Sequence, residues 1–176
     1  METKPLVSVI TINYNQSKVT LDLLRTLREI TYPNIEVIVV DNASPNDNSD
    51  VLKREYPEIT LIKSDVNLGF AGGNNLGARV AKGDFFLFIN NDVEVPADFL
   101  EPLVETLQQN PELGMISPKI KYHWNPELIQ YAGYNPMNHW TIRNSSIGYQ
   151  ENDEGQYDSL RITESIHGAA MMVSRK

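Results

Sequence analysis

Short apolar runs alternate with amphipathic stretches along the first two thirds of the chain. The clearest run is Phe85 to Ile89, an unbroken apolar stretch that is typical of a strand buried on both faces. Other β-branched and apolar runs predict strands at residues 6–12, 35–40, 59–63 and 113–117.

Helical spacing of apolar residues predicts helices between these strands, at residues 18–30, about 47–56, a short segment ending near Lys82-Gly83, and a stretch between Pro96 and Asn110. Ser17 precedes the first of these helices and is a candidate N-cap. The glycine-rich segment 67–77 leads into the third helix. Strands and helices that alternate with short links predict an α/β fold, a Rossmann-like, mostly parallel sheet flanked by helices.

A different pattern follows Pro118. Residues 119–165 mix aromatic residues with Asn, Gly and Pro without a sustained period, which predicts loops and short antiparallel strands. Residues 166–174 are largely apolar and predict a returning strand. We therefore divide the chain into an α/β core, residues 1–118, and a smaller mixed or antiparallel C-terminal region of the same domain, residues 119–176.

Charge and composition exclude or disfavour several classes of function. The net charge of −8 disfavours a nucleic-acid partner, because phosphate contacts need clustered Lys and Arg. It leaves a phosphate ligand open, since a bound divalent cation reverses the local sign. The absence of cysteine excludes thiolate chemistry. No apolar run approaches the ~20 residues of a transmembrane segment, and Met1 to Pro5 lack a signal-peptide pattern, so we expect a cytoplasmic protein, with peripheral association at the inner face of the membrane as an option.

Polar residues recur where successive predicted strands end, at Asn13-Tyr14-Asn15, Asp41-Asn42, Asn67 and Asn90-Asn91-Asp92. Separate turns could explain each group, and Asn90 to Asp92 could simply turn the chain before the helix that follows Pro96. In a parallel sheet, however, these ends share one edge, where ligands bind. One pocket explains all the groups together, and we favour it. Asp92 is then a candidate site for Mg²⁺ and a diphosphate, because hard cations prefer oxygen ligands.

Other classes of protein fit less well. The glycines from Gly69 to Gly77 do not form the Gly-x-Gly-x-x-Gly pattern of dinucleotide-binding enzymes, and they follow the third strand instead of the first. No Gly-Lys-Ser/Thr motif occurs, which disfavours a P-loop enzyme. His123 and His139 lack the spacing of zinc ligands. For Trp124 and Trp140 we favour core packing over stacking on sugar rings.

The chain also resembles a known family. The motifs that carry the resemblance occur in one order: Val7-Ser8-Val9-Ile10, Asn13-Tyr14-Asn15, Val40-Asp41-Asn42-Ala43-Ser44, Asn67 to Asn75, Asn90-Asn91-Asp92 and Gly168 to Val173. They resemble family-two inverting glycosyltransferases of the GT-A fold, with most likeness to the rhamnosyltransferase-like group of bacterial surface-polysaccharide enzymes. The resemblance is dense from residue 5 to about 118.

The resemblance implies roles for these residues. Asn13, Tyr14 and Asp41 would hold the base and ribose of a nucleotide-diphosphate sugar donor, and Asn67 with the following glycines would shape the wall of the site. The donor-binding residues that it implies are Asn13, Tyr14, Asn15, Asp41, Asn42, Asn67, Gly69, Gly73, Asn74, Asn90 and Asn91. A divalent cation, Mg²⁺ or Mn²⁺, would be bound by Asp92.

Two departures from the family bear on activity. Asn90 stands where the family's Asp-x-Asp motif has its first Asp, so we expect weaker metal binding, with Asp92 as the ligand. The family's general base lies beyond the Gly-Ala strand, so we name no catalytic base and expect residues 119–176 to be part of a truncated acceptor-side region. The implied activity is metal-assisted transfer, with inversion, to a cell-surface glycan or lipid-linked glycan acceptor. The alternative is a non-catalytic nucleotide-sugar-binding module or an inactive fragment.

Overall fold

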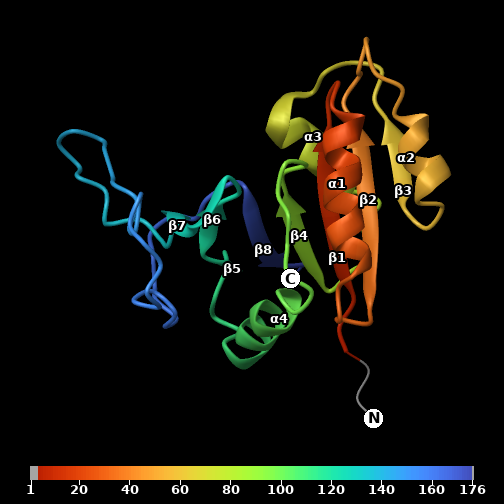
Figure 1. Ribbon diagram of the computed structural model, residues 1–176. Helices are drawn as coiled ribbons and strands as arrows, with labels where there is room; N and C mark the ends of the chain where they lie inside the picture. The colour runs from red at the N-terminus through yellow and green to blue at the C-terminus, as the bar shows by residue number, and fades with distance from the viewer. Residues whose placement is uncertain (1–3, 176) are drawn as a thin grey trace.

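A six-stranded sheet forms the centre of the computed structural model, which describes residues 4–175 (Figure 1). Its strands, in spatial order, are β3 (Thr60–Lys63), β2 (Ile35–Asp41), β1 (Val7–Asn13), β4 (Phe85–Ile89), β8 (Ala170–Ser174) and β5 (Met115–Ile116). Strands β1 to β4 pair in parallel, whereas β8 runs antiparallel to both β4 and β5. The predicted α/β fold with a mostly parallel sheet is therefore confirmed.

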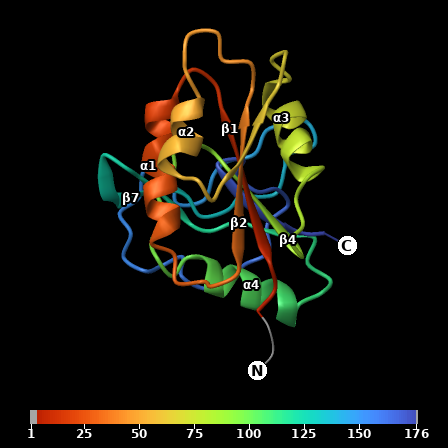
Figure 2. The same ribbon diagram turned by 90° about the vertical axis from the view of Figure 1, so that its right-hand side faces the viewer.

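Helices cover both faces of this sheet (Figure 2). They are α1 (Ser17–Arg28), α2 (Asp50–Glu55), α3 (Gly69–Ala78) and α4 (Leu100–Gln109). Helices α1, α2 and α4 pack on one face, around a main core that includes Leu23, Leu52 and Leu100. Helix α3 and the segment after it pack on the other face, over Ile10, Ile38 and Val40.

The glycine-rich segment is itself a helix, which corrects the prediction that it precedes a helix ending near Lys82-Gly83. Helix α3 spans Gly69–Ala78. A Cβ atom at Gly77 would lie 2.6 Å from Cγ2 of Ile10 and 3.2 Å from Cγ2 of Val40. The glycine therefore lets the helix backbone lie directly on the sheet, a close approach that no side chain would permit.

Ser17 is not the N-cap that the sequence indicated. It is the first residue of α1 and is buried. Its backbone N–H donates a hydrogen bond of 2.7 Å to Oδ2 of Asp47, and its hydroxyl donates to the same oxygen. The first turn of α1 is thus satisfied by a carboxylate from the connection between β2 and α2.

The C-terminal region contributes to the central sheet as well as to a separate one. Strands β6 (Ile120–Tyr122) and β7 (Asn125–Tyr131) form a two-stranded antiparallel sheet, as the pattern indicated. Strand β8, in contrast, pairs with β4 over its whole length, so the boundary after residue 118 is not a boundary of the main sheet. Residues 1–3 and 176 of the two predicted parts lie outside the described structure.

The prediction that the two tryptophans pack in a core is wrong. Trp124 is 72% exposed and Trp140 is 96% exposed. Both lie in the C-terminal region, where few apolar side chains are buried.

No helix within residues 4–175 is both long enough and apolar enough to cross a membrane.

Candidate functional site

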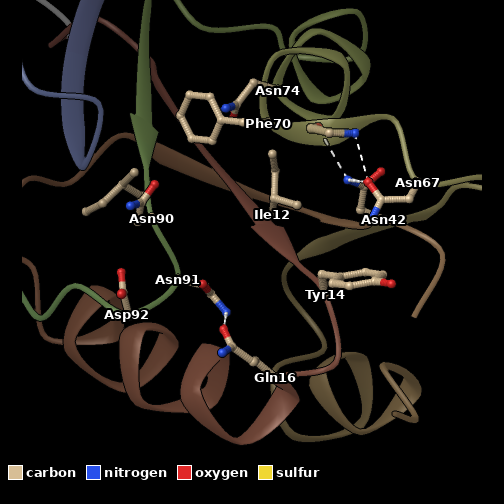
Figure 3. A pocket seen from close by; sticks show the side chains of 12 residues that line it. Ile12, Tyr14, Gln16, Asn42, Asn67, Phe70, Asn74, Asn90, Asn91 and Asp92 are labelled. Atoms are coloured by element: carbon tan, nitrogen blue, oxygen red, sulfur yellow. Dashed lines mark hydrogen bonds between the residues drawn. The ribbon is translucent and has the colours of Figure 1, made fainter. Parts of the chain in front are cut away.

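A pocket of about 350 Å³ opens at the carboxyl edge of the parallel strands (Figure 3). The ends of β1, β2 and β4 and the start of α3 supply its walls. The residues that line it are Ile12, Tyr14, Gln16, Asn42, Asn67, Gly69, Phe70, Asn74, Ile89, Asn90, Asn91 and Asp92. Polar residues from segments far apart in the sequence thus meet in one place.

The structure brings together most of the sequence-predicted site residues. Those that line the pocket are Tyr14, Asn42, Asn67, Gly69, Asn74, Asn90, Asn91 and Asp92, whereas Asn13, Asn15, Asp41 and Gly73 do not line it. Strand geometry explains part of this division, because successive side chains of a strand point to opposite faces. Val9 belongs to the core beneath α1 and Ile10 to the core beneath α3. By the same alternation, Asn13 faces α1 while Ile12 and Tyr14 face the pocket.

Asn13 and Asp41 belong to a buried polar network beneath α1. Both side chains are buried, with 0% and 6% of their surface exposed. Nδ2 of Asn13 donates to Oδ1 of Asp41 at 3.1 Å and to Oδ2 of Asp47 at 3.3 Å. The Ser44 hydroxyl donates to Oδ1 of Asp41. The network therefore fixes the ends of β1 and β2 behind the pocket.

Asn15 and Gly73 also act in the scaffold. Asn15 adopts a positive φ of 55°, a conformation that Asn tolerates well, and its Oδ1 accepts a hydrogen bond of 3.0 Å from the N–H of Asn46. A Cβ atom at Gly73 would lie 2.8 Å from Cδ1 of Ile12, because α3 packs against the sheet there. These two residues shape the turn and the helix that border the pocket.

Asn42 attaches the loop before α3 to the end of β2. Its Nδ2 donates to Oδ1 of Asn67 at 3.0 Å (Figure 3). Its Oδ1 accepts a hydrogen bond of 2.8 Å from the N–H of Leu68. Oδ1 of Asn67 also accepts from the N–H of Gly69 at 2.8 Å. The two amides thus hold the wall of the pocket in place, and Tyr14, which is 44% exposed, stands beside them with its ring accessible.

Asp92 is the only carboxylate among the lining residues, and it lies across the pocket from Tyr14 (Figure 3). Within residues 4–175 no cluster of three or more His, Cys, Asp or Glu side chains could hold a metal ion. A single carboxylate with neighbouring amide oxygens suits Mg²⁺ or Mn²⁺, which is commonly held by one or two carboxylates together with the phosphates of a ligand. The donor set of Asn90, Asn91 and Asp92 therefore fits a cation that a diphosphate helps to bind.

Sequence reasoning missed several residues at this site. Gln16 and Phe70 line the pocket, and Asp47 anchors the network behind it. Burial acts to raise the pKa of Asp47, but hydrogen bonds from the hydroxyl and N–H of Ser17 and from Asn13 outweigh it and hold that pKa below its ordinary value. Asp47 lies in a polar stretch of turn-forming residues, so no local signal distinguishes it from a residue of the turn.

Comparison with known proteins identifies the class to which this fold and site belong. The sequence profile of glycosyl transferase family 2 matches residues 8–167. The chain belongs to this family.

Individual relatives agree with this assignment. An uncharacterized glycosyltransferase of Haemophilus influenzae is 33% identical over 128 residues, which are 72% of this chain and 43% of the relative. A low-salt glycan biosynthesis hexosyltransferase of Haloferax volcanii is 29% identical over 174 residues, 96% of this chain and 52% of the relative. The chain spans about half the length, or less, of these curated relatives.

Solved structures share the fold. A mannosyltransferase of Pyrobaculum calidifontis, solved with GDP-Man and Mn²⁺, aligns over 98% of this chain and 45% of its own, with a TM-score of 0.65 and 20% identity. TarS of S. aureus, residues 1–349 with UDP, aligns over 65% of this chain and 35% of its own, with a TM-score of 0.58 and 24% identity. The GT-A fold expected from the sequence is confirmed.

Proposed function

We propose that the pocket binds a nucleotide-diphosphate sugar together with Mg²⁺ or Mn²⁺. The observation that carries the proposal is the arrangement of the pocket, in which the exposed ring of Tyr14 stands on one side and the Asn90-Asn91-Asp92 segment on the other. The planar base of a nucleotide needs a surface on which to stack. The diphosphate, at the other end of the nucleoside, needs a cation or hydrogen-bond donors beside it. The two requirements are met at opposite sides of one cavity.

Each side of the pocket has a role in this proposal. Tyr14 stacks on the base, and Asn42 and Asn67 hold the wall beside it. Behind the pocket, Asp41 accepts at Oδ1 from Asn13 and Ser44 and so fixes the ends of β1 and β2 that carry these residues. Asp92, with the amides of Asn90 and Asn91, holds the cation. When bound, the cation neutralises the charge that develops on the departing nucleotide diphosphate.

The proposed reaction of the whole protein is transfer of the sugar, with inversion, to a cell-surface glycan or a lipid-linked glycan, in the cytoplasm or at the inner face of the membrane. The names of the relatives support glycan synthesis, and the mannosyltransferase and TarS, solved with GDP-Man and with UDP, support a nucleotide-sugar donor. Inversion and the acceptor are predictions from the family resemblance.

A second candidate function is binding of the sugar nucleotide without turnover. It is favoured by the lack of a second carboxylate among the residues that line the pocket, since inverting transfer needs a general base to take the proton of the acceptor hydroxyl. This candidate would be supported by a sugar nucleotide that binds tightly but is neither hydrolysed nor transferred, even by a protein that spans the full length of the relatives.

A panel of nucleotides tests the binding proposal. UDP, GDP and dTDP, each with Mn²⁺, are added to the protein and its melting temperature is followed, with UMP and NAD as controls. A ligand that binds only the folded state raises the melting temperature. We expect at least one nucleoside diphosphate to raise it, and UMP and NAD to have little effect. A folded protein that responds to none of the diphosphates, or equally to NAD, would contradict the proposal.

A further inference from the structure

Thr20 is a fully buried polar residue that connects the two polar parts of the site. It lies on α1, beneath the end of the sheet. Its hydroxyl donates to Oδ1 of Asn13 at 2.9 Å, and it accepts a hydrogen bond of 3.1 Å from Nδ2 of Asn91. Asn13 belongs to the network beneath α1, and Asn91 lines the pocket beside Asp92. Thr20 is therefore the link between them.

The hydrogen bonds of this network can run in only one direction. Carboxylate oxygens of Asp41 and Asp47 accept hydrogen bonds, so the group of Asn13 that faces them is its NH₂ group. Oδ1 of Asn13 must then face Thr20. The hydroxyl of Thr20 has one proton, and both nearby acceptors, Oδ1 of Asn13 and the carbonyl oxygen of Gln16 at 3.2 Å, compete for it. With its proton used, Thr20 can only accept from its remaining partner.

The direction of the network sets the orientation of the amide of Asn91. Its NH₂ group must point to Thr20, and it also donates to Oε1 of Gln16 at 3.4 Å (Figure 3). Its carbonyl oxygen, Oδ1, is consequently turned away from α1. The half-buried side chain thus presents an acceptor, and not a donor, to the space beside Asp92.

We propose that Thr20 is a positioning residue that fixes the Asn91 carboxamide with its oxygen available to the cation bound at Asp92, directly or through a water. This inference rests on the proposed function, because a cation–diphosphate complex is the ligand that would use such an oxygen. A donating amide in the same place would repel the cation. The apolar residues Leu23, Leu24 and Leu27 already bury α1 against the sheet, so packing of the helix does not by itself require a hydroxyl at this position.

Calorimetric titration of UDP and GDP, each in Mn²⁺ and in EDTA, tests the role of Thr20. The variants are Thr20→Val, which keeps the shape and removes the hydroxyl, and Thr20→Ser, which keeps the hydroxyl. We expect Thr20→Val to weaken Mn²⁺-dependent binding about tenfold, the effect typical of residues that orient a metal ligand. Binding in EDTA should not change, and Thr20→Ser should retain the wild-type affinity.

Thr26→Val is the matched control. Thr26 lies on the same helix. Its hydroxyl donates to the carbonyl oxygen of Leu23 at 2.9 Å and accepts from the N–H of Val95 at 3.4 Å, and none of these residues lines the pocket. Thr26→Val should lower the melting temperature without changing the ratio of the UDP or GDP affinity in Mn²⁺ to that in EDTA. If Thr20→Val likewise lowers only the melting temperature, Thr20 is merely structural and the inference is overturned.

Asn91→Leu keeps the test available if Thr20→Val does not fold, because Asn91 is half-buried and its loss opens no core. Asn91→Leu should reproduce the loss of Mn²⁺-dependent binding. Where Thr20→Val does fold, the double variant should bind no more weakly than Asn91→Leu alone, since the two residues act as a unit. Additive losses would contradict the link. A wild-type protein that binds none of UDP, GDP and dTDP would instead overturn the proposed function itself.

Discussion

At the scale of single residues, Tyr14 carries the proposal for the base. It is half-exposed at the end of β1, and its ring lines the pocket. Stacking of a base on an aromatic ring contributes about 1–3 kcal/mol. We expect Tyr14→Ala to weaken the binding of UDP or GDP by that amount, about 5- to 150-fold in Kd, and Tyr14→Phe to retain most of it.

Calorimetry on these two variants measures the effect, with Tyr149→Ala as the control. Tyr149 is also exposed, but it lies in the C-terminal region and does not line the pocket. Equal affinities for Tyr14→Ala and the wild type would show that the base binds elsewhere.

The sequence predicted which polar residues lie at the strand ends. It predicted only in part which face of the sheet each of their side chains points to. Asn13 and Asp41 were expected in the site and instead lie in the network beneath α1. The period of two along a strand already separates Asn13 from Tyr14, and Asp41 from Asn42. Asp47 and Thr20 could not have been found this way, because their contacts join segments that only the fold brings together.

At the scale of elements, the glycines of α3 determine how closely that helix approaches the sheet. A methyl group at Gly77 would meet Ile10 at 2.6 Å and Val40 at 3.2 Å, both within the buried core. Forcing an extra carbon into a packed core costs about 1–3 kcal/mol. We therefore expect Gly77→Ala to destabilise the protein by this amount, measured by urea unfolding.

Gly114→Ala is the control for that measurement. A Cβ atom there meets nothing within 4 Å, and its φ is not positive, so the substitution should leave the stability nearly unchanged. A Gly77→Ala variant as stable as the Gly114→Ala variant would contradict the account of α3.

The boundaries of α3 could not be predicted from local propensity. Glycine is a poor helix former, so the sequence from Gly69 to Gly77 indicates a loop. The helix forms because its small residues permit contact with Ile10, Ile12 and Val40, an interaction between distant parts of the chain. Amphipathic helices such as α1 and α4 carry their own pattern. Helix α1 was predicted at residues 18–30 and spans Ser17–Arg28, and α4 was predicted between Pro96 and Asn110 and spans Leu100–Gln109.

At the scale of the whole molecule, β8 joins the C-terminal region to the core. Met172 of β8 is fully buried, and the strand covers the edge of β4. A chain that ends after Pro118 would expose this edge and part of the core, so we expect it to aggregate or to lose cooperative unfolding. Circular dichroism with thermal melting and size-exclusion chromatography measure both properties.

Shortening the exposed hairpin near Trp140 is the control for the truncation. The N–H of Asn135 donates to the carbonyl oxygen of Ser145 at 3.0 Å, so a short Asn-Gly turn can replace residues 137–143. That variant should melt at nearly the wild-type temperature. If the chain ending after Pro118 also melts cooperatively and stays monomeric, β8 is not required for the core.

The sequence predicted that residues 166–174 return as a strand, but not which strands they join. Pairing with β4 depends on contacts across roughly eighty residues of chain, which no local pattern records. The same limit applies to the pocket. The parallel strands predicted that a pocket exists at their carboxyl ends, but only the fold shows which residues line it.

The central claim is that Asp92 binds a divalent cation together with a nucleoside diphosphate. The most direct measurement is calorimetric titration of UDP and GDP, in Mn²⁺ and in EDTA, on the wild type, Asp92→Asn and Asp98→Asn. Asp98 is an exposed carboxylate of the same connection and does not line the pocket. We predict that Mn²⁺ strengthens binding to the wild type and to Asp98→Asn, and that Asp92→Asn loses this dependence. Equal strengthening by Mn²⁺ in Asp92→Asn would contradict the claim.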